Sequence, residues 1–424
     1  MLEEILDRRN IEKALVAVER NKGACGVDGM QSDELRPFLN THYQCLRSGI
    51  LTGHYEPKPV RKVVIPKAQA GVRMLGIPSV VDRMLQQAIQ QWLSPQLEGE
   101  FDKNSYGFRP NRNAQMAVQA AKRFLEEGNT WIVELDLEKF FDTVNHQKLM
   151  NLLRERIKDK RTLKLIHLYL KSGIMEGGIV SQRTEGTPQG SPLSPLLSNI
   201  LLDKLDKELN RRGHKFVRYA DDCSIYVKSE KSATRVMESI KAYIEETLLL
   251  KVNKEKSRMS RPHQCYLLGF CFYKYRGEYQ IRVAPKSLQR IREKCKLITK
   301  SSNPAKEEIK LQKLDLVIRG WVNYFKIAKA KSKMIALDEM IRIRLRISAW
   351  RRWKRIRTKI ENLVKLGVPK RKAYQWGNSS KGACRLAHSP VLSTTLNVLY
   401  WRKLGYKGFF NYYHWQTDAP TLQF

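Results

Sequence analysis

The sequence predicts a mixed α/β unit, followed by an all-helical, strongly basic unit and a small C-terminal segment. Between Arg61 and about Tyr273, short β-prone runs such as Val63–Ile65 and Trp131–Asp136 alternate with longer helical patterns, as is typical of mixed α/β folds. From about Ala284 onward the strand signals fade, and helical patterns rich in Lys and Arg take over. Because 424 residues exceed the size of one hydrophobic core, we expect two to four structural units.

Changes in composition suggest where these units begin and end. Pro57 and Pro59 close an N-terminal helical stretch, and Gly367 and Pro369 mark a later break. The expected domains are an N-terminal extension over 1–60, the α/β unit over 61–282, the helical unit over 283–365 and a small basic segment over 366–424.

Three stretches of the second half are predicted to be helices. Ser287–Lys300 and Lys306–Lys329 show helical periodicity and are separated by a polar break that ends at Pro304. The strict alternation of Ile341–Ile347 fits a strand, whereas its helical neighbours and their combined length fit a helix. We predict a helix there.

The charge of the chain points to a polyanionic partner. The formal net charge is +36, and residues 284–424 hold 32 Lys/Arg against 8 Asp/Glu, which is +24 of that total. A field of this size favours nucleic acid, because each phosphate neutralised by a cation releases condensed counterions. A membrane surface is the alternative, but the sequence contains no run of 18 apolar residues and no lipidation motif.

Cysteine and histidine usage does not indicate a zinc site. The seven cysteines are scattered without a Cys-x-x-Cys pair, which fits a reducing cytoplasm. The eight histidines are equally dispersed, and His146 is expected to be a capping or surface residue. We therefore expect neither zinc nor an organic cofactor.

Paired acids occupy the turn of a predicted hairpin. Phe216–Val227 contains two β-prone runs around a short polar turn, which places Asp221 and Asp222 at its tip. An isolated pair has a simple alternative explanation, because Asp is common in turns for local hydrogen-bonding reasons. However, Asp136 ends a largely apolar strand on the same face as Glu134, where a carboxylate is costly unless it is paired or bound to metal.

Three converging carboxylates predict a metal centre. Like charges repel, so such a cluster makes physical sense chiefly with Mg²⁺ present. Two divalent cations about 4 Å apart are the usual solution for in-line phosphoryl transfer, where one activates the attacking hydroxyl and one holds the leaving phosphates. Asp136, Asp221 and Asp222 are the predicted catalytic residues and the ligands of two Mg²⁺ ions.

Short motifs surround these acids in a fixed order. Besides the Asp136 strand and the Tyr219 hairpin they are Gly26–Gly29, Ile65–Lys67, Gly71–Pro78, Ser105–Pro110, Gly186–Gly190, Leu250–Ser257, Leu267–Phe270 and Arg319–Phe325. In this order the chain resembles the bacterial group II intron-encoded reverse transcriptases and maturases, from about residue 20 to at least residue 360. The resemblance implies an α+β right-hand polymerase, with fingers and palm, followed by an all-α thumb or maturase domain, called domain X.

The resemblance also implies how a nucleotide is held. Lys67 and Arg73 match basic residues that hold the incoming triphosphate, although each could be an ordinary surface charge. Phe141 matches an aromatic residue that blocks a ribose 2′-hydroxyl and so selects deoxynucleotides, whereas by itself it would be called a core residue. Gln189 and Tyr219 match residues beside the nucleotide.

Lys256 is the candidate proton donor. It matches the residue proposed in the family as general acid for the departing pyrophosphate, and an ammonium group can serve that role. A Lys in a charged helix cap is an equally plausible explanation.

The helical half is expected to bind nucleic acid. The family's thumb grips the primer–template duplex and the structured intron RNA, and a run this basic repels itself unless phosphate is nearby. A solvated helix face is the simpler alternative. The predicted nucleic-acid-binding residues are Arg319, Trp321, Arg342, Arg346, Arg351 and Arg352.

The chain departs from DNA-cutting relatives after Gly367. Those relatives carry an endonuclease with paired cysteines and histidines, and only Cys384, His388 and His414 follow here, so we expect no endonuclease. The aromatic residues of 366–424 could stack bases or form a small core, and by position the segment looks like the family's DNA-binding segment.

These features predict an RNA-directed DNA polymerase that also binds group II intron RNA to promote splicing and retrohoming. The alternatives are a domesticated reverse transcriptase used in repair or defence, and a splicing-only maturase. The expected partners are intron RNA, an RNA template with its DNA primer, target DNA and deoxynucleoside triphosphates, without a membrane. We expect the protein in the cytoplasm, on the nucleoid when bound to DNA.

Overall fold

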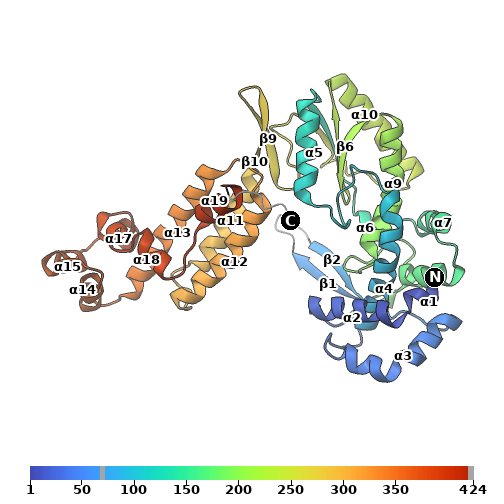
Figure 1. The fold of residues 1–424 in the computed structure, drawn as a ribbon, viewed down its shortest axis with the longest axis horizontal. Coiled ribbons are helices and arrows are strands. Elements are labelled where there is room, and N and C mark those ends of the chain that lie inside the picture. Colours follow the sequence, from blue (N-terminus) through green and yellow to red (C-terminus); the bar gives the residue numbers. More distant parts are fainter. Residues whose placement is uncertain (67–71, 419–424) are drawn as a thin grey trace. The chain divides into compact units, whose positions relative to one another are not determined.

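The chain forms two compact units, Met1–Pro262 and His263–Phe424. The structure is a computed structural model that describes residues 1–66 and 72–418. Two four-stranded sheets lie in the first unit, and the second consists of helices and one hairpin (Figure 1). Among the described residues, no helix is long and apolar enough to span a membrane.

The N-terminal helices share the core of the first unit. They are α1 (Leu2–Ile5), α2 (Arg8–Asn21) and α3 (Leu35–Thr52), and they precede α4 (Val80–Leu97). Asp7 caps α2, and α2 packs its Ile11 and Leu15 face against α4. Leu15 belongs to the same buried cluster as Val133 of the central sheet. The expected N-terminal extension is therefore packed into this unit.

A small sheet has the strand order β2-β1-β4-β5. Its strands are β1 (Val60–Pro66), β2 (Val72–Ile77), β4 (Ile174–Glu176) and β5 (Ile179–Ser181). β1 pairs antiparallel with β2, so that Ile65 lies opposite Arg73, and parallel with β4. Gly177 and Gly178 join β4 to β5 at φ 57° and 87°, as a two-residue hairpin turn requires. The strand predicted at Val63–Ile65 is confirmed.

The central sheet carries the predicted acids. Its order is β6-β7-β3-β8, all antiparallel. Leu135 lies opposite Cys223 and Tyr219 opposite Asp222, so the end of β3 meets the β6–β7 turn. The predicted strand at Trp131–Asp136 and the predicted hairpin are confirmed. The strands are β3 (Trp131–Leu135), β6 (Lys215–Tyr219), β7 (Asp222–Val227) and β8 (Arg258–Ser260).

Helices cover this sheet. α5 packs on β6 and β7, α9 contacts β6, and α10 packs on β3, β7 and β8 (Figure 1). Val133, Phe216 and Ile225 from one face of the sheet are buried in the main core. The helices of this unit after α4 are η1 (Glu98–Glu100), α5 (Ala114–Glu126), α6 (Phe140–Thr143), α7 (His146–Arg156), α8 (Lys160–Lys171), α9 (Ser194–Arg211), α10 (Glu230–Ala242) and the π-helix η2 (Tyr243–Thr247).

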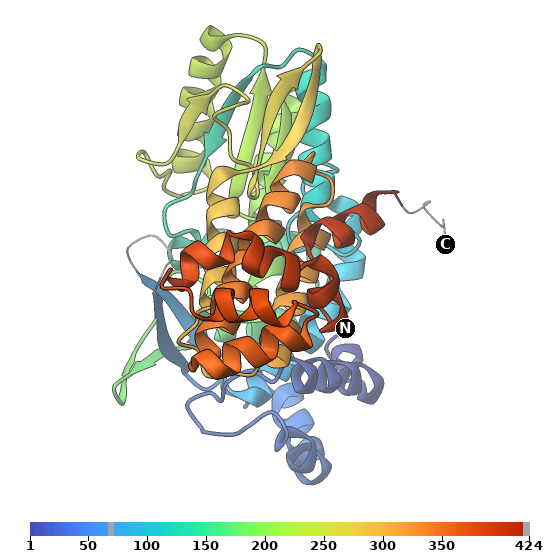
Figure 2. The same cartoon turned by 90° about the vertical axis from the view of Figure 1, so that its left-hand side faces the viewer.

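The second unit begins with a hairpin and continues as helices, drawn from yellow to red in Figure 2. The hairpin, which lies within the expected 61–282 unit, packs with the helical unit, and the expected domain limits remain predictions. The elements are β9 (Phe270–Tyr275), β10 (Glu278–Val283), α11 (Pro285–Ile298), α12 (Glu307–Phe325), α13 (Lys331–Arg352), α14 (Ile356–Lys365), α15 (Lys370–Gly377), α16 (Ala383–Ala387), α17 (Pro390–Thr395), α18 (Val398–Lys403) and α19 (Phe409–Asp418).

The ambiguous alternating stretch is helical, as predicted. It lies in the middle of α13, which buries Ile341 and Leu345 one turn apart. Arg344, between them, donates to Thr299 Oγ1 at 2.8 Å and to the Lys296 carbonyl at 3.0 Å. The alternation therefore reflects arginines that bind neighbouring elements, and not the two faces of a strand.

Asp338 of α13 ties the C-terminal segment to the helical unit. Its buried carboxylate accepts hydrogen bonds from the Tyr406 hydroxyl at 2.7 Å and from the amides of Phe409 and Phe410 at 2.7 and 2.9 Å. Those two amides begin α19, so Asp338 caps that helix from another element. A Cβ on Gly408 (φ 83°) would lie 3.0 Å from this carboxylate.

Most aromatic residues that contact this junction form a small core. Trp401 and Phe409 are fully buried, and Tyr406 and Tyr413 are nearly so. Trp415, by contrast, is 62% exposed. Of the two interpretations of these aromatic residues, core packing accounts for Trp401, Tyr406, Phe409 and Tyr413. Outward rings such as Trp415 are accessible for stacking on bases.

Replacement of Asp338 by Asn should loosen this junction. The change puts an amide group among backbone donors, which should lower the free energy of unfolding by about 1–3 kcal/mol. Denaturant unfolding measures this loss. Glu361→Gln, which removes an exposed partner of Arg357 at 2.9 Å, should stay within about 0.5 kcal/mol. Equal midpoints for the two variants would contradict the proposed cap.

Candidate active site

The predicted acids lie at a tight turn. Ala220 and Asp221 connect Tyr219 and Asp222, which pair across β6 and β7. Ala220 has a left-handed backbone (φ 58°), a conformation that costs a residue with a side chain roughly 1–2 kcal/mol. The surrounding structure must therefore hold this turn in place.

One neighbour that holds the turn is Gly107. A Cβ added to it would collide with the backbone nitrogen of Ala220, so only glycine allows this approach. The preceding residues run along the edge of β6, where the Tyr106 amide donates to the Arg218 carbonyl at 2.9 Å and the Arg218 amide donates to the Asn104 carbonyl at 2.9 Å. The Ser105–Pro110 motif thus forms a backbone wall beside the acids.

The second neighbour is the fully buried side chain of Arg218. Its guanidinium donates to both Asp206 carboxylate oxygens at 2.7 and 2.6 Å and to Asn199 Oδ1 at 3.0 Å. It also donates to the Ser105 hydroxyl at 2.7 Å and to the Ala220 carbonyl at 2.9 Å. All five guanidinium N–H donors are therefore used, and one of them holds the turn itself.

This network fixes the turn to α9. Asp206 and Asn199 belong to that helix, and the Asn199 amide also donates to the Gly107 carbonyl at 3.0 Å. A buried charge without its partner destabilises a fold by about 3–5 kcal/mol, so the two halves of the pair require each other. The turn is positioned by a buried ion pair and not by local turn chemistry.

Asp136 is held by the Leu250–Ser257 motif. Its amide donates to Ser257 Oγ at 3.0 Å, and its carbonyl accepts from the Asn253 amide at 2.8 Å. Lys256 Nζ lies 3.4 Å from one carboxylate oxygen of Asp136. The third acid and the predicted proton donor are therefore neighbours.

The three acids interact electrostatically. Burial, with the charges of Asp221 and Asp136, raises the pKa of Asp222 to about 6. Burial also raises the pKa of Asp221, while the positive charges of Arg73 and Lys256 oppose that rise. Within residues 1–66 and 72–418 no three Asp, Glu, His or Cys side chains are gathered as a metal site. The acids are thus close enough to repel one another without meeting at ligand distances.

Backbone hydrogen bonds join the loops expected around the nucleotide. The Thr187 amide donates to the Phe141 carbonyl at 2.6 Å, and the Gly76 amide of β2 donates to the Gln189 carbonyl at 2.9 Å. Gly186 (φ 82°) lies so close to the backbone of Asp142 that a Cβ would come within 2.7 Å of it. The Gly186–Gly190 motif therefore links β2 to the residues after β3.

His146 takes part in this link, contrary to our expectation of a capping or surface position. Asn145 provides the cap of α7 instead. The buried His146 ring lies with Nε2 2.7 Å from the Gly186 carbonyl, so Nε2 carries the proton of this hydrogen bond. Burial lowers the pKa of His146, which keeps the ring neutral.

The structure brings several predicted residues to one place. Arg73 is exposed on β2 and its charge reaches Asp221. Tyr219 ends β6 directly before the turn, and Phe141 is partly buried with its ring edge-on to Phe140. Gln189 is partly buried in its motif. Lys67 lies outside the described residues.

Comparisons with known proteins agree with this geometry. Residues 65–272 match the reverse transcriptase (RNA-dependent DNA polymerase) family, and residues 288–367 match the maturase-specific domain of group II introns. Protein YkfC of Escherichia coli is 34% identical over 293 residues, which cover 60% of this chain and 77% of YkfC. The chain belongs to the group II intron reverse transcriptase and maturase family.

A second relative is the group II intron-encoded protein LtrA of Lactococcus lactis. It is 29% identical over 309 residues, which cover 58% of this chain. The matched region spans about half of LtrA, 51% of its length. The reverse transcriptase domain of this family is an RNA-directed DNA polymerase, and both matched domains imply contact with nucleic acid.

The maturase-domain residues predicted to bind nucleic acid have partners within the protein. Arg319 pairs with Asp315 at 2.8 Å, and Trp321 packs against Phe325 and Phe409. Their roles toward nucleic acid remain predictions.

The predicted arginines of α13 are also engaged. Arg346 donates to the Leu396 and Ala387 carbonyls at 3.1 and 3.3 Å, while Arg351 donates to Ser301 and Arg352 to Glu307, both at 2.6 Å. Arg342 is partly exposed on the same helix. Several of these residues tie α13 to its neighbours as well as adding positive charge.

Sequence reasoning placed Gly107 and Arg218 within motifs without giving either a role, and it missed Asp206. Arg218 shares its strand face with the buried Phe216, and a charge on an apolar face is a usable signal. Asp206 likewise lies one turn from the buried Leu202 and Leu209 of α9. Arg218 and Asp206 lie on different elements that meet only in the folded protein. The pattern within one element could therefore show an unexpected buried charge, but it could not show which residue pairs with that charge.

Removal of either half of the buried pair should both destabilise and slow the enzyme. Arg218→Met and Asp206→Leu should each lower the free energy of unfolding by roughly 3–5 kcal/mol. The double variant should lose less than the sum, because neither charge is left alone. Arg211→Met, at an exposed pair with Glu208, should cost at most about 1 kcal/mol.

Kinetic measurements distinguish a role of the Arg218–Asp206 pair in positioning the turn from a role in stabilising the fold alone. If the pair positions the turn, the folded double variant should show a lower kcat for primer extension with little change in KM. A double variant with the parent's kcat would refute the positioning role.

Proposed function

We propose that this chain copies RNA into DNA from a primer 3′-hydroxyl, and that its helical unit binds group II intron RNA to promote splicing and retrohoming. The observation that carries the polymerase proposal is that three carboxylates at the end of the central sheet lie close enough to repel one another. Asp136 arrives from β3, and Asp221 and Asp222 from the turn that Arg218 holds.

We propose that these three carboxylates hold two Mg²⁺ ions. The donor set fits, because Mg²⁺ prefers carboxylate oxygens, and the raised pKa of Asp222 reflects its burial together with the negative charges of Asp221 and Asp136, which a cation would offset. When bound, the ions supply charge that activates the primer hydroxyl and stabilises the leaving pyrophosphate. The chain's own part is to hold Asp136, Asp221 and Asp222 on rigid elements.

Other residues would bind and orient the nucleotide. Arg73 is exposed and near Asp221, so it can pair with the triphosphate, and Lys67 is proposed for the same role. Phe141 would close the space beside the ribose 2′ position, and Gln189 and Tyr219 would lie next to the nucleotide.

Lys256 is proposed as the proton donor to pyrophosphate. Its Nζ lies beside Asp136 and is well exposed, so it can reach a bound ligand.

The C-terminal segment 366–424 is proposed to contact target DNA. A hollow of about 540 Å³ lies between α12 and this segment, and its lining includes Arg319, Arg402, Lys407, Tyr412 and Trp415. Exposed rings among cations suit a nucleic acid strand. We also propose that the protein works in the cytoplasm and joins the nucleoid when it holds DNA.

Asp221→Asn should abolish DNA synthesis. Loss of one metal-binding carboxylate should lower the rate of primer extension on an annealed RNA template by roughly 10³-fold or more, which corresponds to several kcal/mol. Glu138→Gln is the matched control, because it removes an exposed carboxylate only two residues after Asp136. Parent-like extension by Asp221→Asn would overturn the proposed active site.

Phe141→Ala should relax sugar selection. Removal of the ring should raise the use of ribonucleotides relative to deoxynucleotides by roughly 10- to 100-fold, the range expected for one steric contact. Competition between the two nucleotides in single-turnover extension measures this ratio. If the parent already uses ribonucleotides as readily as deoxynucleotides, the assignment of Phe141 fails.

A further inference from the structure

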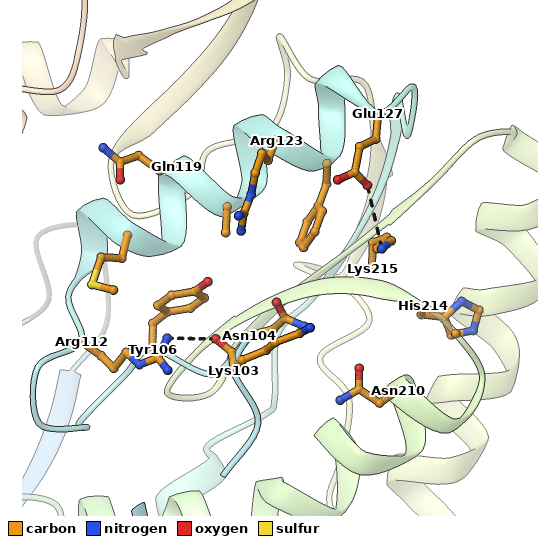
Figure 3. A pocket seen from close by; sticks show the side chains of 14 residues that line it. Lys103, Asn104, Tyr106, Arg112, Gln119, Arg123, Glu127, Asn210, His214 and Lys215 are labelled. Carbon is orange, nitrogen blue, oxygen red and sulfur yellow. Dashed lines mark hydrogen bonds and ion pairs between the residues drawn. The ribbon is translucent and has the colours of Figure 1, made fainter. Parts of the chain in front are cut away.

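A basic hollow lies on the first unit away from the acids. It has a volume of about 780 Å³ and lies between α5, the Ser105–Pro110 region and the start of β6 (Figure 3). Four of its lining side chains are cations: Lys103, Arg112, Arg123 and Lys215. Glu127 is the one acid among the lining residues. The hollow therefore carries a strong excess of positive charge.

Two of the cations that line the hollow lie over aromatic rings. The Arg112 guanidinium lies 5.6 Å from the ring centre of Tyr106, and Lys215 Nζ lies 5.9 Å from that of Phe124. Both rings are nearly buried, which leaves the cations as the groups that a ligand would meet.

The charges of the hollow are only weakly neutralised. Glu127 reaches Lys215 at 4.0 Å, the limit for an ion pair. Arg123 extends from α5 into the hollow toward Tyr106 (Figure 3) and forms no ion pair within the described part of the chain. Weakly neutralised cations in a concave site favour an anionic ligand.

A second hollow continues the first. It measures about 700 Å³ and shares Glu127, Gly213, His214 and Lys215 with its neighbour. Its lining adds the cations Arg212, Lys228 and Arg235. We call the cations of both hollows the palm track: Lys103, Arg112, Arg123, Arg212, Lys215, Lys228 and Arg235.

The palm track is distinct from the catalytic centre. Lys215 begins β6, and the catalytic turn follows the other end of that strand at Tyr219. At about 3.3 Å per residue, these two ends lie roughly 13 Å apart. A ligand at the Lys215 end of the track would therefore not touch the three acids.

We propose that the palm track binds a single-stranded nucleic acid through its phosphates. Two adjoining hollows suit a strand of several nucleotides better than one nucleoside phosphate, and each cation can neutralise a successive phosphate. A duplex is a convex rod that could not enter a hollow of this size. Asn104, Gln119 and Asn210 on the walls offer amides to sugars or base edges.

Site-specific crosslinking tests the proposal. A 12-nucleotide RNA that carries 4-thiouridine is irradiated with the full chain in the absence of metal and nucleotides. A saturating primer–template is included so that it occupies the proposed active site at Asp136, Asp221 and Asp222. We expect crosslinks in peptides that span residues 103–127 and 212–235. The same oligomer as DNA, with 4-thiothymidine, distinguishes recognition of the shared phosphates from recognition of the ribose hydroxyl.

A charge-reversal variant supplies the second measurement. Arg123→Glu with Lys215→Glu should remove these crosslinks, weaken binding of the oligomer roughly tenfold and reduce the salt slope by about 1.4. The matched control reverses two exposed cations outside the track, Arg154→Glu with Lys158→Glu, and should keep the crosslinks.

The proposal fails if the parent shows no crosslinks in these peptides, or if the track variant keeps them. It also fails if the control variant loses them equally. Because the measurement is binding without catalysis, its outcome is independent of the Asp221→Asn test of the polymerase proposal.

Discussion

The buried ion pair between Arg218 and Asp206 is the constraint on which the catalytic end of the palm depends. The left-handed backbone of Ala220 is energetically unfavourable, and the Arg218 guanidinium helps to hold it by donating to the Ala220 carbonyl. The pair joins a strand to a helix, and the other three guanidinium donors of Arg218 bind Asn199, Ser105 and the Ala220 carbonyl, so strand, helix and turn are tied together. Gly107 is required beside it because the packing leaves no room for a side chain. Asp221 and Asp222 are thus positioned by buried groups beside the turn, whereas Asp136 is held by Ser257 and Asn253.

The neighbouring loops are also held in place by contacts between segments that are distant in the sequence. Arg73, Gln189 and Phe141 come from three different segments, and backbone hydrogen bonds through Gly76 and Thr187 join those segments. If these residues bind a nucleotide as proposed, the frame already holds them in place, which lowers the entropic cost of binding. The strongly basic helical unit and the palm track then provide charge for polyanions outside this frame.

Much of this arrangement was predictable from local patterns. The strand before Asp136, the hairpin around Asp221 and the α12 and α13 helices follow from period-2 and helical spacing, and the metal argument needs only three acids that converge. What the sequence could not supply are partnerships between distant elements. Arg218 with Asp206, His146 with Gly186, and Asp338 with the start of α19 are tertiary contacts of single polar groups, for which no periodicity exists. The expected limit at residue 282 likewise depends on which unit the β9–β10 hairpin packs with.

The central claim is that the buried pair sets the geometry in which the acids bind divalent cations. Titration of Mn²⁺ followed by electron paramagnetic resonance measures this directly, with Asp221→Asn defining ions bound elsewhere. In Asp206→Asn, with thermal unfolding showing that it is still folded, the account predicts roughly tenfold weaker Mn²⁺ binding, equivalent to about 1.4 kcal/mol. An affinity equal to that of the parent would contradict it.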